Sequence, residues 1–466
     1  MNKMNSIQFG EGNFIRAFVD YCIQLLNEKT EFNGKVSVVQ PIEKGKIEIL
    51  KNQKGQFHMF IEGKFNNKNI RDIKVISCID KVINPYNEFE SFLELANDEN
   101  LNFVFSNTTE AGIEYNKNDL KSMKPPISFP GKLTIFLYNR FKFFKGDKNK
   151  ILHIIPCELI ESNGEKLKKI ILKIALDWNL GRKFYYWINK NKFHNSLVDR
   201  IVPGYPKKNL VFYKKQLQFN DELMVACEPF FLWVIEGGKD LKKKFPVEQI
   251  KKIDVRIVKD IGIYKTRKIQ ILNGSHTIMV SLGIISNIDN VSDFLKNSFL
   301  KKILIDTVVN EIILSINHDS MELKKYFNKT LERFENPFID HKLKAISLNS
   351  LSKFKSRIIP SIVSFSKIYN RAPYNLYFIL SSFIILYHRR KHFKILDNYS
   401  DQFLFDDIKL GDDYVNKILS NKNFWGVDLS KLPKLKDYTS VGIKLISDEY
   451  DIKKAYSDYI EKIKTL

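Results

Sequence analysis

The sequence predicts a doubly wound α/β domain over residues 1–253, followed by a mostly α-helical domain over residues 254–466. The chain has 466 residues, more than a single hydrophobic core comfortably serves, so two domains are expected. In the first half, short apolar runs of strand length alternate with helical patterns. From about Asp254 onward, apolar residues recur at helical spacing instead, which indicates the second domain.

The first element is a strand over Ser6–Phe9 that runs through the glycine pair Gly10 and Gly12 into a helix. An apolar stripe that begins at Phe14 indicates this helix. A strand, a glycine turn and a helix form the context of a dinucleotide-binding fingerprint, because glycine lets backbone amides approach a pyrophosphate at the positive end of the helix. The third glycine of the general fingerprint is absent, since Ile15 stands there. We therefore expect a Rossmann-type first domain with its cofactor at this turn.

The second strand, Lys35–Gln40, ends where an acid that binds the adenosine ribose is often found. This chain has Gln40 at that point, followed by one acid and one base. An acid favours NAD and a basic residue tolerates the 2′-phosphate of NADP, so these residues leave the cofactor undecided. The next segment, Gln56–Phe65, is typical of a hairpin inserted after the second parallel strand, with His58 expected on its surface.

Two further buried strands are expected at Leu101–Ser106 and Ile151–Pro156. Asn107 and Thr108 follow the first of them at its carboxyl end, where open α/β sheets bind ligands. Both residues are therefore candidates for cofactor contact, and an ordinary polar turn is the alternative.

The second domain begins with a helix in which Lys268, Asn273 and His276 fall within three turns. At roughly 100° per residue, the three side chains spread over about 140° of the helix and can converge on one partly apolar pocket. A partly desolvated lysine can act as acid and base because burial lowers the pKa of an amine, while an amide and an imidazole can hold and polarise a substrate oxygen. This set suits the reduction of a carbonyl group or its reverse. An amphipathic basic helix with a buried, satisfied histidine is the alternative.

Other polar residues are candidates for substrate contact. Asp199 and Arg200 bring an acid and a base side by side, which fits a structural ion pair as well as an active-site network. A later segment gathers groups that could grip a carboxylate, although any one of them could instead serve packing or the surface. These are Arg333, Asn336, His341, Lys353 and Arg357.

The formal net charge of +22 comes from 75 Lys and Arg against 53 Asp and Glu. These cations are scattered and no nucleic-acid-binding signature is present, so we expect a solvated basic surface without a nucleic-acid partner. No export signal is seen, and the apolar run Leu376–Leu386 is too short to cross a bilayer. We expect a cytoplasmic protein with no membrane association and no obligate protein partner. The widely spaced cysteines, without a CxxC pair, fit a reducing compartment and no zinc site; they are Cys22, Cys78, Cys157 and Cys227.

Over most of its length the chain resembles the long-chain, metal-independent mannitol dehydrogenase family, above all the branch that reduces tagaturonate. In order and spacing, Lys268, Asn273 and His276 match the catalytic Lys, Asn and His of that family. The glycine turn matches the family motif Gly-x-Gly-x-Phe-x-Arg-Ala. The segments that carry the resemblance are Ile7–Phe14, Phe105–Gly112, Leu197–Ile201, Lys268–His276 and Arg333–Pro337. The residues that it assigns to the cofactor are Gly10, Glu11, Gly12, Asn13, Phe14, Arg16 and Ala17, together with Asn107 and Thr108.

The resemblance implies an NAD-dependent oxidoreductase of hexuronate catabolism that interconverts D-tagaturonate and D-altronate without a metal. Lys268 would supply the proton, Asn273 would stabilise the oxyanion and His276 would orient the substrate oxygen. Many family members carry a further oxyanion asparagine where this chain has Leu159, and Asn163 is the candidate substitute. The alternatives are a fructuronate or mannitol/polyol oxidoreductase and a dinucleotide-binding protein without catalysis.

Overall fold

The computed structural model describes residues 4–66, 68–108, 110–207, 209–338, 341–397, 412–448 and 451–466. The chain divides into two compact units, Met1–Ile261 and Gly262–Leu466. The expected boundary between residues 253 and 254 falls just before strand β12 (Asp254–Val258). This strand lies in the first unit, where it pairs in parallel with β11 (Leu232–Glu236).

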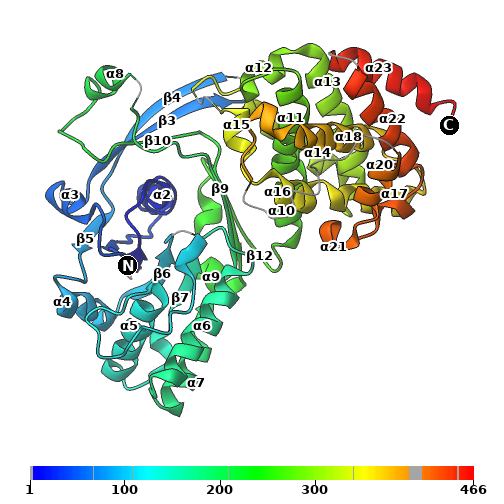
Figure 1. The fold of residues 1–466 in the computed structure, drawn as a ribbon. Helices are drawn as coiled ribbons and strands as arrows, with labels where there is room; N and C mark the ends of the chain where they lie inside the picture. The colour runs from blue at the N-terminus through cyan, green and yellow to red at the C-terminus, as the bar shows by residue number, and fades with distance from the viewer. Residues whose placement is uncertain are drawn as a thin grey trace. The chain divides into compact units, whose positions relative to one another are not determined.

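The first unit is built on a six-stranded sheet in which all strands are parallel, as predicted for a Rossmann-type domain (Figure 1). The strand order reverses between β1 and β6, and in such sheets the ligand crevice lies at the carboxyl ends of the strands at this point. In spatial order the strands are β5 (Ile79–Ile83), β2 (Val36–Val39), β1 (Asn5–Phe9), β6 (Leu101–Ser106), β7 (His153–Pro156) and β8 (Lys192–Phe193).

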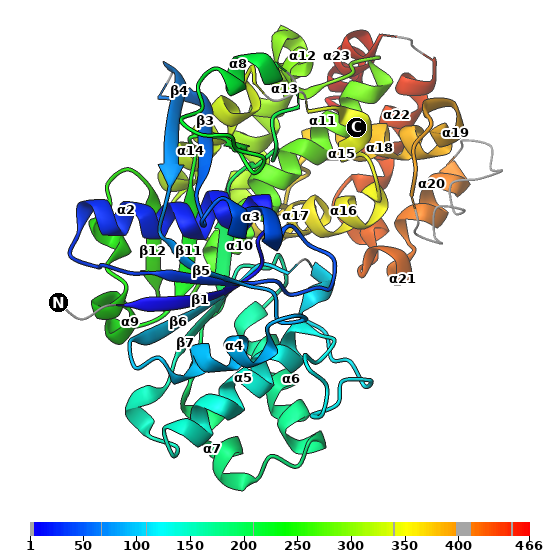
Figure 2. The ribbon, with the colours of Figure 1, turned by 90° about the vertical axis from the view of Figure 1, so that its left-hand side faces the viewer.

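Helices cover both faces of this sheet, so alternate side chains of each strand enter two different cores. In β6, Phe103 and Phe105 belong to the core shared with α2 (Tyr21–Lys29), whereas Val104 belongs to the core on the opposite face. Figure 2 shows α2 on one side of the sheet and α4, α5 and α6 on the other. The helices of the second face are α4 (Phe89–Glu94), α5 (Phe129–Phe143), α6 (Asn163–Asp177) and α7 (Arg182–Lys190).

Two three-stranded sheets complete the first unit. The segment expected to form the hairpin, Gln56–Phe65, forms only its first strand, β3 (Phe57–Phe65), and the second strand is β4 (Lys68–Ile76). In the same sheet, β10 (Val225–Cys227) pairs in parallel with β3. In the other sheet, β11 pairs with β12 and, antiparallel, with β9 (Ser196–Asp199).

The expectation that His58 lies on the surface of the hairpin is wrong. His58 is fully buried, its Nδ1 lies 2.9 Å from the Asp221 carboxylate, and its Nε2 accepts a hydrogen bond from the backbone amide of Gln218. Both partners lie in the segment that leads into β10, which covers this side of the hairpin. The short remaining elements of the unit are α1 (Asn13–Ile15), η1 (Arg16–Asp20), α3 (Ile47–Asn52), η2 (Leu95–Asn97), η3 (Glu110–Gly112), η4 (Lys148–Lys150), α8 (Leu210–Lys214), α9 (Lys239–Lys244) and η5 (Val247–Gln249).

The described part of the second unit contains helices and no strands, apart from an isolated bridge between Asn290 and Lys342, and it confirms the predicted helical domain. Its central helix is α18 (Tyr374–His388), which is buried along almost its whole length and packs against α11 and α22. Among the described residues, no helix combines the length and the apolar character needed to cross a membrane. The other elements are α10 (Gly262–Arg267), η6 (Lys268–Asn273), α11 (Gly274–Ile285), α12 (Val291–Lys296), α13 (Ser298–Thr307), η7 (Val308–Ile312), η8 (Ile313–Ser315), α14 (Ser320–Phe334), α15 (Leu343–Ile346), α16 (Ser350–Arg357), α17 (Ile359–Tyr369), α19 (Arg390–Phe393), α20 (Asp412–Leu419), α21 (Lys422–Trp425), η10 (Leu429–Lys431), α22 (Leu435–Asp448) and α23 (Ile452–Ile463).

A buried carboxyl group, Glu311, caps the start of the central helix. Its two oxygens accept hydrogen bonds from the backbone amides of Asn375, at 2.9 Å, and Leu376, at 2.8 Å. Burial raises the pKa of Glu311 to about 8, against the opposing effect of these two hydrogen bonds.

Candidate active site

In the first unit, the glycine turn brings the ends of β1 and β6 into close contact. Gly10 has a φ of +123°, and a Cβ added to it would lie 2.9 Å from the carbonyl oxygen of Asn107. The backbone amide of Asn107 donates to the carbonyl oxygen of Phe9 in the neighbouring strand at 3.1 Å. Only glycine fits this conformation and spacing without strain.

Gly12 has the opposite surroundings, because a Cβ added there would meet no atom within 4 Å. It is exposed and precedes a helix that runs from Asn13 to Lys29 through α1, the π-helical segment η1 and α2. An open helix start with an exposed glycine suits the approach of a pyrophosphate, so the turn fits a dinucleotide. Phe14, also assigned to the cofactor, is half-buried and stacks on Phe18 with ring centroids 5.0 Å apart.

Arg16 and Ala17, which were expected to contact the cofactor, lie inside the protein. The Arg16 guanidinium donates to the Glu11 carbonyl oxygen at 3.0 Å, to the Asn13 side chain at 2.9 Å and to the Leu223 carbonyl oxygen. Burial lowers its pKa to about 10, so the group remains a cation. These contacts hold the turn from its buried side, which fits a positioning role for Arg16.

Arg200 binds backbone groups behind this turn. Its Nη1 donates to the Ala17 carbonyl oxygen at 2.6 Å, and its Nε donates to the Glu228 carbonyl oxygen at 2.9 Å. Asp199, which is buried at the end of β9, stands opposite Leu232 in the sheet. Backbone groups thus bind the Nε and Nη1 atoms of Arg200, and the substrate contact expected of Asp199 and Arg200 stays a prediction.

Side-chain hydrogen bonds of Gln40 and Glu11 hold the segment after β2 in place. Gln40 donates to the Glu43 carbonyl oxygen at 3.0 Å and accepts from the amide of Ile47 at 3.3 Å. Glu11 accepts from the amide of Lys46 at 3.2 Å, and burial raises the pKa of Glu11. A neutral residue thus occupies the end of the strand, and the cofactor stays undecided between NAD and NADP.

Glu158, which is not among the residues predicted for the site, orders the loop after β6. Its buried carboxylate accepts hydrogen bonds from the amide and hydroxyl of Thr108 and from the hydroxyl of Ser106, each at 3.0 Å. Asn107 is held as well, since its side chain donates to the Cys157 carbonyl oxygen at 2.9 Å. Burial raises the pKa of Glu158. An acid two residues after the end of the buried strand β7 is the signal that could have identified it.

The hypothesis that Asn163 replaces the missing family asparagine is not supported by its contacts. Its amide nitrogen donates to the carbonyl oxygens of Pro156, Glu158 and Ser196 at 3.0 to 3.1 Å. Its side-chain oxygen accepts from the backbone amides of Gly164 and Ser196, both at 2.9 Å. The amide is buried and saturated by backbone groups, so no donor remains for a substrate oxygen.

In the second unit, α10, η6 and α11 run on as one helix, because the junction residues Arg267 and Gly274 keep right-handed helical backbone angles. The middle segment, η6, is a π-helix that begins at Lys268 and ends at Asn273. A π segment adds about one residue to a turn, which turns the following residues back by about 100°. Relative to Lys268, Asn273 moves from about 140° to about 40°, and His276 from about 80° to about −20°. The three candidate catalytic residues therefore share a narrower face than a regular helix predicts.

His276 is held in an aromatic setting on this helix. Its ring lies 4.5 Å from the ring of Phe334 and 4.9 Å from that of His341, measured between centroids. His341 is half-buried, and burial lowers its pKa. The candidate substrate residue His341 thus does lie beside the candidate catalytic histidine. Arg333 and Asn336, on either side of the end of α14, are both buried.

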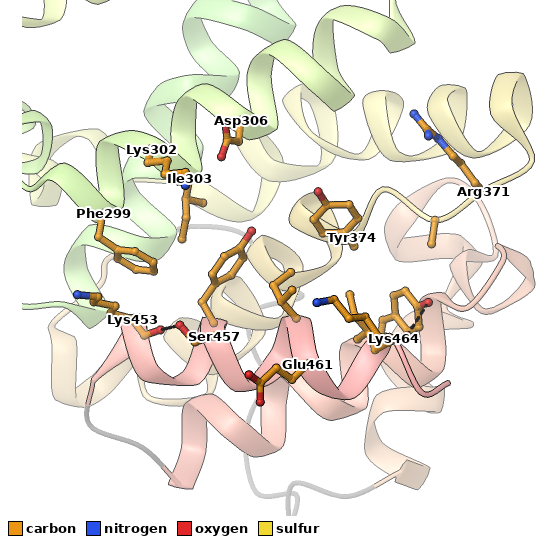
Figure 3. A pocket seen from close by; sticks show the side chains of 15 residues that line it. Phe299, Lys302, Ile303, Asp306, Arg371, Tyr374, Lys453, Ser457, Glu461 and Lys464 are labelled. Atoms are coloured by element: carbon orange, nitrogen blue, oxygen red, sulfur yellow. Dashed lines mark hydrogen bonds between the residues drawn. The ribbon is translucent and has the colours of Figure 1, made fainter.

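A cavity of about 880 Å³ elsewhere in the second unit is lined by α13, α22, α23 and the start of α18 (Figure 3). Its wall carries tyrosines such as Tyr374 and Tyr456 and cations such as Lys302, Lys453 and Arg371. It contains none of the candidate catalytic residues, and no residue of the helix that carries them lines it. We therefore do not assign the reaction to this cavity.

Comparisons with known proteins cover nearly the whole chain. Residues 4–249 match the family described as mannitol dehydrogenase Rossmann domain, and residues 260–441 match the mannitol dehydrogenase C-terminal domain. An altronate oxidoreductase of Bacillus subtilis is 37% identical over 97% of this chain and 94% of its own length. An altronate oxidoreductase of Bacteroides thetaiotaomicron is 37% identical over 92% of this chain and 91% of its own length.

Solved structures show the same fold at lower identity. A D-sorbitol dehydrogenase crystallised without substrate has a TM-score of 0.80 at 20% identity and covers 97% of each chain. A Pseudomonas fluorescens mannitol 2-dehydrogenase, in ternary complex with NAD and D-mannitol, has a TM-score of 0.67 at 18% identity. That likeness covers 100% of this chain and 95% of the other.

Proposed function

Given that the chain belongs to the mannitol dehydrogenase family, we propose that it is an NAD-dependent oxidoreductase that reduces D-tagaturonate to D-altronate. Family membership makes it a dehydrogenase that uses a nicotinamide dinucleotide. The substrate pair, the choice of NAD and the roles of single residues are the proposal.

The observation that carries the proposal is the shared face of Lys268, Asn273 and His276. The π segment turns an amine, an amide and an imidazole towards one side of a single helix. A carbonyl reduction requires a proton donor and oxyanion stabilisation at one oxygen atom, and these groups provide both.

When bound, the reduced dinucleotide supplies the hydride. Lys268 donates a proton to the substrate oxygen, and the Asn273 side chain donates a hydrogen bond to the negative charge that develops there. His276, which packs against Phe334 and His341, orients the same oxygen. In the reverse direction, Lys268 takes up the proton of the alcohol.

The sugar-acid substrate is supported by the altronate oxidoreductases that are 37% identical over almost the whole chain. NAD rests on the family, since Gln40 is neutral and bonded to its own loop. A cytoplasmic place for the reaction is supported by the four cysteines, which are all free and buried.

The test is the loss of NADH absorbance when purified protein is added to D-tagaturonate. D-fructuronate, D-fructose and NADPH serve as parallel controls. We expect fast oxidation of NADH with D-tagaturonate and slow reactions with the other substrates. A preference for D-fructose or D-fructuronate would overturn the substrate, and a preference for NADPH would overturn the cofactor. NADH binding without turnover of any substrate would support the alternative, a dinucleotide-binding protein without catalysis.

A further inference from the structure

One arginine lies beside the candidate catalytic helix. Arg357 is the last residue of α16, which packs against both η6 and α11. Its Nη1 lies 3.5 Å from the carbonyl oxygen of Asn273 and 3.5 Å from the hydroxyl oxygen of Thr277. The guanidinium therefore lies along the stripe of the helix that carries Asn273.

These two contacts occupy little of the hydrogen-bonding capacity of Arg357. A guanidinium has five N–H donors in a rigid fork, and both contacts involve one nitrogen at the outer limit of hydrogen-bond distance. Among the described residues, no carboxylate forms an ion pair with Arg357, whereas Lys301 and Lys342 of the same unit pair with Glu335 and Asp289. A half-buried cation without a paired anion is suited to bind an anionic group of a ligand.

A second cation stands one turn earlier on the same helix. Lys353 is half-buried and its Nζ donates to the Ile346 carbonyl oxygen at 2.9 Å. Burial, and then the positive charge of Arg357, lower the pKa of Lys353. The two like charges at a spacing of four residues repel each other, and a bound anion would relieve the repulsion.

We propose that Arg357 is the residue that selects an acid over a neutral sugar, by binding the carboxylate of the substrate with a planar, two-pronged contact. Lys353 adds positive charge to the same subsite. A carboxylate matches the guanidinium fork, while a neutral ketose presents only hydroxyl groups there and gains no charge pairing. This inference rests on the proposed function, because it names the part of the site that recognises the acid.

The experiment compares the wild type with Arg357→Gln, Arg357→Lys and Arg371→Gln. Arg371 is the matched control, since it is an exposed arginine on the wall of the other cavity, 5.1 Å from the Phe365 ring. For each protein, kcat and KM are measured with D-tagaturonate and with D-fructose. The thermal shifts caused by NADH alone, and by D-altronate added to the NAD complex, give readouts that do not depend on turnover.

With Arg357→Gln, we expect KM for D-tagaturonate to rise about 10- to 100-fold, the range for loss of a hydrogen bond to a charged group. The thermal shift from D-altronate should disappear, the shift from NADH should persist, and kcat/KM for D-fructose should change less than about threefold. Arg357→Lys should recover part of the loss, because it keeps the charge without the fork. Arg371→Gln should behave like the wild type.

Two results would overturn the proposal. An equal loss with both substrates would make Arg357 a support of the helix, and an unchanged KM for D-tagaturonate would place acid recognition elsewhere. Failure of the proposed function looks different, because the wild type itself would then leave D-tagaturonate unreduced while still binding NADH. If Arg357→Gln fails to fold, Arg357→Lys and its substrate ratio decide alone.

Discussion

The imidazole rings of His276 and His341 meet edge to face, with centroids 4.9 Å apart and planes inclined by 78°. On another side, His276 contacts the ring of Phe334 at 4.5 Å. His276 is 8% exposed, and these two rings pack against it. A histidine that must aim one nitrogen at a substrate oxygen depends on such packing.

Replacement of His341 should show whether this residue only packs against His276 or also transfers a proton. His341→Phe keeps an aromatic edge against His276, so kcat/KM should stay within about threefold of the wild type. His341→Ala removes that contact and should lower kcat/KM about 10-fold, with most of the loss in kcat. Because burial lowers the pKa of His341 below its ordinary value of 6.5, its neutral form prevails above that pH. The pH profiles of the wild type and His341→Phe should therefore coincide above pH 6.5, and a divergence there would give His341 a proton-transfer role.

Lys268→Ala should slow the chemical step and leave cofactor binding intact. Loss of a positioned acid and base typically costs about 100- to 10,000-fold in rate. Lys268 lies in the second unit, whereas the glycine turn that fits the dinucleotide lies in the first. Single-turnover kinetics and NADH titration measure the two effects separately. A collapse of NADH affinity would make Lys268 a cofactor or structural residue.

Gly10 and Gly12 form a matched pair with opposite expected defects. Alanine at Gly10 must adopt a φ of +123° and place a Cβ 2.9 Å from the Asn107 carbonyl oxygen, so stability should fall by about 1 to 3 kcal/mol. Alanine at Gly12 meets no protein atom within 4 Å, so the fold should stay within about 0.5 kcal/mol of the wild type. NADH affinity should nevertheless fall about 10-fold with Gly12→Ala, because the methyl group occupies the approach to the helix start. Denaturant unfolding and NADH titration check the pair, and full NADH affinity in Gly12→Ala would move the pyrophosphate away from this turn.

Glu311→Gln should change how stability depends on pH. The folded-state pKa of Glu311 is raised from 4.5 to about 8, so the carboxyl group ionises more readily in the unfolded chain. Its contribution to stability is fully present below about pH 4.5 and is lost as the pH rises through about 8. Glutamine does not titrate, so between pH 5 and pH 9 the variant should gain about 1 to 4 kcal/mol relative to the wild type. Melting curves across this range test the expectation, with the exposed Glu322→Gln as control; parallel curves for Glu311→Gln and the wild type would contradict it.

Local patterns were enough to predict the fold class. The strand, glycine turn and helix at the start of the chain follow from residues that are neighbours in sequence, and the helical second unit follows from a regular apolar spacing. His58 shows the limit of predictions from residues that are neighbours in sequence. The hairpin segment alone predicts His58 on its surface, but the partners that bury it come from the segment before β10, far along the chain.

The candidate site was predictable as a set of residue types but not as a geometry. Asn163 lies close in sequence to Leu159, where many family members carry an asparagine. Its side chain, however, forms hydrogen bonds with the backbone of Ser196 in β9. The narrow face of the candidate catalytic helix had no sequence signal either, because a calculation at 100° per residue assumes α-helical hydrogen bonds throughout. For Asn163, the deciding hydrogen bonds reach Ser196, 33 residues away in sequence, so they depend on the tertiary structure.

The π segment between Lys268 and Asn273 also sets a limit on engineering this chain for heat resistance. Regularising a helix is an ordinary route to stability, and removal of one residue from this turn would restore α-helical hydrogen bonding. The same deletion would rotate His276 by about 100° away from Lys268. On the proposed mechanism, a helix made regular at this turn would be more stable but would lose catalytic activity. Variants selected for thermal stability alone are therefore expected to lose activity through changes at this turn.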